Sequence, residues 1–378
     1  MQKPRLSLAL LTAACFSVSL VLVAQTRLIP LTPDAWDPNG IPVTFTTHLG
    51  VPAMRIGPAR TDAGNPSVTV RDFVFRDGTV EYDFALDSSF FSELHFRRLD
   101  VDNGEHVYLR TFRADEPRAN SAFQYSAIYK GVNYWDLSPE YQVPVEIKPE
   151  GWNHVKLVVK GRQLLAYVND VDRPALYVPR LDTDIPAGAL SLSGRGYYAN
   201  VTYRPETPGL YGEEGRFAGG RDGRYLTSWR VSAPQTIDMD RMVSRVPVPE
   251  DTTGYRAIEA ERFGLVNLSR PFGKTPDATK RVAFLTTTLE SDAAREVEVA
   301  LGFSDEVAVY VNGELAFVGE TRFGTPQIAY PAGRVDVDNA SFTLPLHEGE
   351  NRIDVALANY FYGWGLKARL RETAGLSW

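Results

Sequence analysis

The stretch Thr79–Leu86, TVEYDFAL, alternates polar and apolar side chains over most of its length. In an extended chain successive side chains point to opposite faces, so Glu81 and Asp83 share one face while Tyr82 and Phe84 share the other. This alternation is typical of a strand in an antiparallel sheet that covers a core with one face. Similar short runs, closed by Gly, Pro, Asp or Asn, occur at 106–112, 154–159, 163–168 and 189–192.

A second group of such runs begins near residue 225 and continues through 280–289, 296–303, 306–311, 341–346 and 352–357. Between the two groups, residues 206–224 are rich in glycine and charge and lack periodicity, which indicates a linker. The sequence therefore predicts an all-β chain with two antiparallel β-sandwich (jelly-roll) domains, at 42–205 and 225–372.

The N-terminal residues 1–24 predict a secretory signal peptide or an uncleaved membrane anchor. Lys3 and Arg5 precede an uncharged apolar run from Leu6 to Ala24. The one cysteine, Cys15, lies inside this run, so the exported chain would have no disulfides. We expect a secreted or cell-envelope protein, of bacterial type, that meets a membrane only through an uncleaved or lipidated N-terminus.

The net charge and the spacing of the histidines argue against nucleic-acid and metal ligands. The formal net charge is −7, without a basic stripe, which argues against nucleic acid as a partner. The five histidines are scattered and form no His-x-His or His-Glu-x-x-His motif, so the sequence predicts no metal site and no cofactor. Residues 336–339, DVDN, could offer oxygen ligands to a structural calcium ion, but they also fit a solvated acidic turn.

Residues 50–203 resemble concanavalin A-like sandwiches of the lectin/glucanase and laminin-G type. The resemblance is carried in order by Phe75–Glu81, Glu105–Arg110, Trp152–Val159 and Gly188–Leu192. It implies a fold but no single activity, because that fold serves lectins, lyases, hydrolases and inert spacers. Many glucanases carry E-x-D-x-x-E on one strand. Here Leu86 stands at the second glutamate, so the carboxylate pair of a retaining glycosidase is incomplete.

Residues 225–372 resemble the galactose-binding-like jelly rolls attached to β-galactosidases and other glycan enzymes. The resemblance rests on Ser304–Glu314 (SDEVAVYVNGE), Leu344–Ile353 (LPLHEGENRI) and Gly363–Leu366 (GWGL). It implies mainly a scaffold, with a hairpin turn at Asn312-Gly313 and a packed Trp364. The aromatic run Tyr360–Trp364 is either a sugar-stacking cluster or a plug of the core.

The candidate ligand site lies on strands of the first sandwich. Alternation places His106, Tyr108 and Arg110 on one face, and Glu93, His95 and Arg97 on one face of the preceding run. Planar rings beside fixed polar groups are what a saccharide site requires. The predicted ligand-binding residues are Arg97, Glu105, Tyr108, Arg110, Gln124, Tyr125 and Trp135.

Several interpretations of this face remain open. The main hypothesis is carbohydrate binding, whereas the same side chains could form a structural charge network. An enzyme is the second class: a glycoside hydrolase or polysaccharide lyase with Glu105 or Glu93 as acid/base and His95 or His106 assisting. The third class is a structural or adhesion module for a protein partner. The sequence assigns no catalytic residue.

Overall fold

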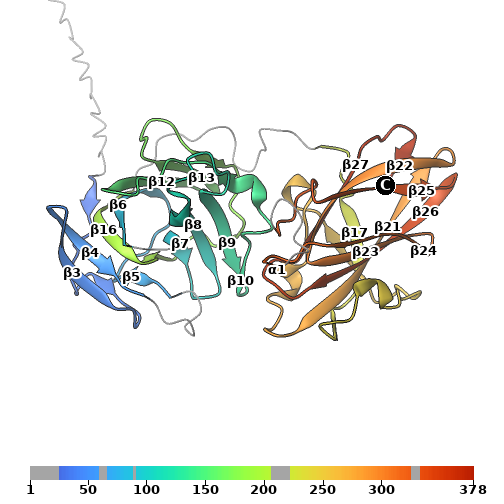
Figure 1. Cartoon of the computed structure of the whole chain (residues 1–378), viewed down its shortest axis with the longest axis horizontal. Helices are drawn as coiled ribbons and strands as arrows, with labels where there is room; N and C mark the ends of the chain where they lie inside the picture. The colour runs from blue at the N-terminus through green and yellow to red at the C-terminus, as the bar shows by residue number, and fades with distance from the viewer. Residues whose placement is uncertain (1–24, 59–65, 88–90, 206–221, 325–332) are drawn as a thin grey trace, which may run out of the picture.

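The computed structural model describes residues 25–58, 66–87, 91–205, 222–324 and 333–378, and its regular secondary structure is mostly antiparallel strand (Figure 1). The all-β prediction is confirmed. The predicted signal or anchor and most of the predicted linker lie outside the described residues. Among the described helices, none is long and apolar enough to cross a membrane.

Two sheets form the first sandwich, drawn blue to green in Figure 1. One runs in the order β14 (Leu176–Val178), β13 (Gln163–Val168), β12 (Asn153–Lys160), β6 (Gly78–Leu86), β16 (Gly196–Arg204), β4 (Val51–Ile56) and β3 (Val43–His48), with β1 (Arg27–Leu28) on β16. The other runs β10 (Val132–Asn133), β9 (Phe123–Tyr129), β8 (Gly104–Arg110), β7 (Phe91–Arg98), β15 (Ala189–Ser193), β5 (Val68–Val70) and β2 (Trp36–Asp37), with β11 (Gln142–Val143) on β9.

Strand β6 behaves as its alternation predicts. Tyr82 and Phe84 are buried in the core between the two sheets. Glu81 and Asp83 lie on the outer face, where His154 of β12 stands between them: its Nδ1 is 2.8 Å from Asp83 Oδ1 and its Nε2 is 3.2 Å from Glu81 Oε2. The two carboxylates are thus engaged with one imidazole on a half-exposed surface.

Two further sheets form the second sandwich. The larger runs β19 (Arg256–Glu259), β17 (Ser228–Val231), β21 (Lys280–Ser291), β26 (Gly349–Asn359), β23 (Glu306–Val311) and β24 (Glu314–Glu320), with β18 (Gln235–Ile237) and β28 (Leu376–Ser377) on β21. The smaller runs β20 (Val266–Asn267), β27 (Gly365–Leu370), β22 (Arg295–Ser304) and β25 (Ala340–Leu346). The short helices are α1 (Ser269–Phe272) and the 3-10 turns η1 (Thr111–Arg113), η2 (Pro139–Tyr141), η3 (Val243–Arg245) and η4 (Arg262–Gly264).

Local signals in the second sandwich lie where the sequence places them. Asn312 and Gly313 both have positive φ, 52° and 88°, and turn β23 into β24. Two adjacent residues with positive φ are the requirement of a type I′ hairpin turn, which Asn-Gly meets at low steric cost. Trp364 is fully buried in the core of this sandwich.

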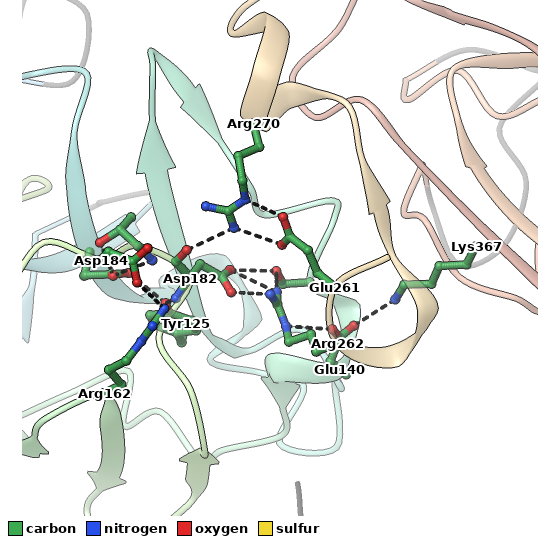
Figure 2. A network of polar contacts seen from close by, with 12 residues as sticks. Tyr125, Glu140, Arg162, Asp182, Asp184, Glu261, Arg262, Arg270 and Lys367 are labelled. Atoms are coloured by element: carbon green, nitrogen blue, oxygen red, sulfur yellow. Dashed lines mark hydrogen bonds and ion pairs between the residues drawn. The ribbon is translucent and has the colours of Figure 1, made fainter. Parts of the chain in front are cut away.

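Buried ion pairs join the two sandwiches (Figure 2). Arg262, in η4 of the second sandwich, donates to Asp182 Oδ2 at 2.9 Å and lies 3.2 Å from Glu140 Oε1, both in the first. Glu140 Oε2 in turn accepts from Lys367 Nζ at 3.1 Å. We call Glu140, Asp182, Arg262 and Lys367 the junction cluster. Because cation and anion alternate through it, the charges are compensated where water is excluded.

Candidate functional site

One side of the sheet that holds β15, β7, β8 and β9 is lined by polar side chains and faces away from the core. The register sets Glu93 opposite Tyr108, His95 opposite His106, and Ser193 opposite Glu93. Alternate residues such as Leu94 and Val107 fill the core on the other side. We call this surface the polar face; it consists of Ser191, Ser193, Glu93, His95, His106, Tyr108, Arg110, Gln124 and Ser126.

Four of the seven predicted ligand residues converge at one end of the polar face. Gln124 Oε1 accepts from Tyr108 Oη and from Arg110 Nη2, each at 2.7 Å. Gln124 Nε2 donates to the backbone oxygen of Trp135 at 2.6 Å, and Arg110 Nη1 donates to Ser121 O at 2.6 Å. The polar groups are therefore held rigidly, and they satisfy one another.

Glu105 and Tyr125 do not belong to this set, and their assignment to it is wrong. Glu105 is one residue out of phase with Tyr108 and Arg110, so it points to the opposite side of the sheet. Its carboxylate accepts from Tyr125 Oη at 2.7 Å and from Thr183 Oγ1 at 2.6 Å, beside the junction cluster. Burial raises the pKa of Glu105 to about 7, even though the hydrogen bonds from Thr183 and Tyr125 lower it.

Arg97 does not lie on the polar face with Glu93 and His95, as the sequence predicts, because a β-bulge interrupts the alternation of β7. The register between β15 and β7 shifts there, and Arg97 takes a φ of 49°. Its guanidinium donates to Asp77 Oδ1 at 2.8 Å and to Gly161 O at 2.6 Å, on the rim of a separate cavity of about 220 Å³. Arg97 therefore cannot act together with Arg110.

The predicted face is not an open surface. All seven predicted residues are buried, with Trp135 the most exposed at 8%. The exposed groups at this end come from the second sandwich: Phe323 and Tyr362, each 46% exposed, meet the Trp135 ring edge-on at centroid distances of 5.2 and 5.9 Å. Phe361 stacks on Phe323 at 5.9 Å. We call Trp135, Phe323, Phe361 and Tyr362 the aromatic rim.

Arg334 of the second sandwich connects the aromatic rim with the polar face. Its guanidinium carbon lies 5.1 Å from the centre of the Trp135 ring, and its Nε donates to Gln142 Oε1 at 3.0 Å. Burial, together with the positive charge of Arg110, lowers the pKa of Arg334 to about 10. Two cations are thus held close together at this end. Such an arrangement favours an electron-rich ligand or a negative group.

A cluster of Glu93, His95 and His106 lies at the other end of the polar face. The sequence analysis proposes these residues only as the acid/base groups of a possible enzyme. One ligating atom from each lies within 4.8 Å of the others. Both histidines are buried, whereas the Glu93 side chain is 22% exposed. Burial lowers the pKa of His95 to about 4 despite the opposing effect of Glu93.

Two of the histidines that are scattered in the sequence are therefore neighbours in space. His95 and His106 are eleven positions apart, but the β7–β8 hairpin sets them directly opposite each other, with ring centroids 5.1 Å apart. The signal available in the sequence was the pattern Glu-x-His on one strand facing His-x-Tyr on the next. In the acidic stretch at 336–339, Asp336 Oδ1 instead accepts the backbone N–H of Asp338 at 3.0 Å, as in a simple turn.

A wider cavity, of about 660 Å³, lies on the second sandwich. It is lined by residues 244–250 and by Tyr310, Asn312, Arg352 and Asp354. Arg352 Nε donates to Asp354 Oδ1 at 2.9 Å within it. It has a ring, an amide and a charge pair, but it is separate from every predicted ligand residue.

Comparisons with known proteins give only distant structural matches. No family model and no curated protein matches the chain. Among solved structures, it is similar to the carbohydrate binding module CBM66 from Bacillus subtilis, at 18% identity over 45% of this chain and 95% of that one, with a TM-score of 0.34. It is also similar to a native glycosidic hydrolase, at 12% identity over 49% and 98%, with a TM-score of 0.35.

A third similar structure is the Bacillus licheniformis β-glucanase, at 9% identity over 48% of this chain and 98% of that one, with a TM-score of 0.33. The fold itself rests on the sheet order described above, and matches this distant carry no argument about function.

Proposed function

We propose that this chain is a carbohydrate-binding protein whose ligand lies against the aromatic rim and meets the adjoining end of the polar face. The observation that carries the proposal is the position of Trp135. Its backbone oxygen anchors Gln124 of the polar face, while its ring contacts the exposed Phe323 and Tyr362. Export through the signal-like segment 1–24 remains part of the proposal.

The chemistry of the rim suits a sugar. Pyranose rings present C–H faces that pack on aromatic rings, and Phe323 and Tyr362 leave almost half of their surface in water. Exposed apolar rings gathered at one place cost solvation free energy and commonly mark a binding surface. Because the exposed rings come from the second sandwich and the polar groups from the first, the proposed site requires both.

The hydrogen-bonded array behind the rim supplies orientation. Tyr108, Arg110 and Gln124 are locked by one another, so a hydroxyl that reaches them meets groups of fixed geometry. The same interlocking means that replacing Arg110 would disturb the fold as well as the site, because it would leave the partly buried Ser121 O without this donor. The exposed rings are therefore the better residues to change.

The test compares retention of the purified chain on a glycan array and in glycan-containing affinity gels. We expect the double variant Phe323→Ala/Tyr362→Ala to bind roughly tenfold more weakly or worse than the parent, with little change in melting temperature. The matched control is Trp378→Ala, which removes another exposed ring, 39% accessible and bonded through its indole N–H to Tyr225 O. The control should bind as the parent does.

Other outcomes decide against the proposal. If the double variant retains every glycan as well as the parent does, the rim is not the site, and the cavity around Tyr310 and Arg352 becomes the next candidate. If the parent is retained on no glycan, the aromatic rim is better explained as a contact for a protein partner. Cleavage of a retained glycan would move the assignment to the hydrolase or lyase class.

A further inference from the structure

The Glu93–His95–His106 cluster lies on two interior strands of a sheet in the first sandwich. Glu93 and His95 lie on β7 and His106 lies on β8, and both strands have hydrogen-bonded neighbours on either side. Glu93 Oε2 is 3.0 Å from His95 Nε2 and 3.7 Å from His106 Nδ1. Positions fixed by a paired sheet hold side chains more accurately than a loop does.

A chain of hydrogen bonds fixes which nitrogen of His106 carries its proton. The backbone N–H of Trp135 donates to Asn133 Oδ1 at 3.1 Å, which identifies that atom as the amide oxygen. Ser126 Oγ donates its one hydrogen to the same oxygen at 2.7 Å. Ser126 Oγ can then only accept from His106, 2.7 Å away, so Nε2 of His106 bears the hydrogen.

This tautomer turns a lone pair of His106 towards a carboxylate. With the hydrogen on Nε2, the Nδ1 atom of a neutral ring is an acceptor, and it faces Glu93 Oε2 across 3.7 Å. His106 is 1% exposed, and its Nδ1 makes no hydrogen bond to any residue that the structure describes. Two electron-rich atoms that face each other beside a buried ring repel, and a cation between them relieves that repulsion.

We propose that Glu93, His95 and His106 bind one divalent transition-metal ion. Ligand atoms that each lie about 2.0–2.1 Å from a tetrahedral ion are roughly 3.3 Å apart, and the observed 3.0 and 3.7 Å lie on either side of that spacing. Two imidazoles and one carboxylate are a donor set for zinc, iron or manganese, whereas calcium and magnesium prefer oxygen. The proposal does not depend on the carbohydrate function.

The surroundings supply what such a site needs besides its ligands. The contact of His106 Nε2 with Ser126, itself held by Asn133, orients the ring as outer hydrogen bonds do in metal sites. Ser193 Oγ donates to Glu93 Oε2 at 3.0 Å and fixes the carboxylate. Ser193 Oγ also lies 3.1 Å from His95 Nε2, so ion binding at that nitrogen requires the His95 proton to lie on Nδ1 and the ion to replace this contact. The partly exposed edge of Glu93 leaves an approach from solvent.

The group of His154, Asp83 and Glu81 serves as an internal control for the proposed metal site. His154 is likewise grouped with two carboxylates, but Asp83 and Glu81 lie on opposite nitrogens of its ring. Three ligating atoms cannot converge on one ion in that arrangement, and Glu93, His95 and His106 form the one group of three convergent ligands found within the described ranges. Zinc affinity should therefore respond to changes at Glu93 and His106 but not at His154.

The experiment uses the full chain without a histidine tag, stripped with a chelator and titrated with zinc chloride by calorimetry. We expect one zinc per chain, with metal content confirmed by mass spectrometry, and no comparable heat from calcium chloride. Glu93→Gln and His106→Gln should each weaken zinc binding at least tenfold. His154→Gln should leave it unchanged.

A second measurement on the unmutated chain guards against variants that misfold. Cobalt(II) bound by two imidazoles and a carboxylate should give visible absorption that zinc removes by displacement. Absence of any bound ion would overturn the proposal and show that a proton on His106 Nδ1 compensates Glu93 instead. Zinc binding that is equal in all three variants would also overturn it, because the ion would then lie elsewhere.

Discussion

The junction cluster and the Glu93–His95–His106 cluster are both buried and polar, yet they differ in how their charges are matched. At the junction, Arg262 lies between Asp182 and Glu140, and Lys367 lies beyond Glu140, so each anion meets a cation (Figure 2). In the second cluster an imidazole lone pair faces a carboxylate with no cation on the chain between them. Burial marks both, but only the incomplete pairing indicates a ligand.

The largest effect should come from breaking the compensated cluster. Arg262→Met leaves Asp182 and Glu140 buried beside each other without their shared cation, so we expect a loss of about 3–5 kcal/mol in the free energy of unfolding. Urea denaturation would measure it. The control is Arg173→Ala, which removes an ion pair with Asp170 at a side chain that is 88% exposed and should change nothing measurable. A loss below about 1 kcal/mol for Arg262→Met would contradict the structural role of the junction.

A smaller effect should appear in the pH dependence of stability next to the junction. The pKa of Glu105 is about 7 in the folded chain, above its ordinary value, chiefly because of burial. The folded state therefore binds more protons than the unfolded state between about pH 4.5 and 7, so this group makes stability fall as pH rises through that window. Asp182, with a pKa raised by burial to about 6, acts in the same direction.

Glu105→Gln isolates the contribution of this one group. The variant should flatten the fall in unfolding free energy between pH 5 and pH 7.5 by up to roughly 3 kcal/mol, because one buried titration is removed. Urea titrations of parent and variant at the two pH values would measure the difference. Identical pH profiles would mean that Glu105 titrates alike in both states.

These contrasts also show what the sequence could and could not provide. Alternation correctly placed Tyr82 and Phe84 inside and Glu81 and Asp83 outside, because the period of two is a local property of a strand. The same rule, applied strictly, would have separated Glu105 and Tyr125 from Tyr108 and Gln124. The bulge at Arg97 depends on a mismatch with β15, a strand almost a hundred residues away, so no local pattern announces it.

The residues that surround Trp135 could not be predicted from the sequence for the same reason. Nothing near Trp135 in the sequence indicates that Phe323, Arg334 and Tyr362 of another sandwich would surround it. The pairing of His95 with His106 was within reach, because a hairpin joins two nearby strands and its register follows from the turn. Local sequence patterns predict where strands form, but they do not predict which distant segments pack against one another.

The smallest expected effect concerns His154, the exposed counterpart of the proposed metal cluster. Its hydrogen bond to Asp83 raises its pKa above the ordinary value, against the opposing effect of partial burial. A raised histidine pKa stabilises the fold fully below about pH 6.5, and that stabilisation is lost as pH rises through the folded-state pKa. His154 is one third exposed, so solvent screens the pair and the change should stay below about 1 kcal/mol.

His154→Gln should therefore remove a shallow decline in stability above pH 6.5 while leaving zinc affinity intact, which thermal melts across pH 6 to 9 would detect. The comparison is sharp because both clusters place histidine beside carboxylate. Where both ring nitrogens already have carboxylate partners, the cluster responds only to protons. Where a ring nitrogen is left facing a carboxylate, the cluster should respond to a metal ion. A zinc response that vanished with His154 would reverse this assignment of the two clusters.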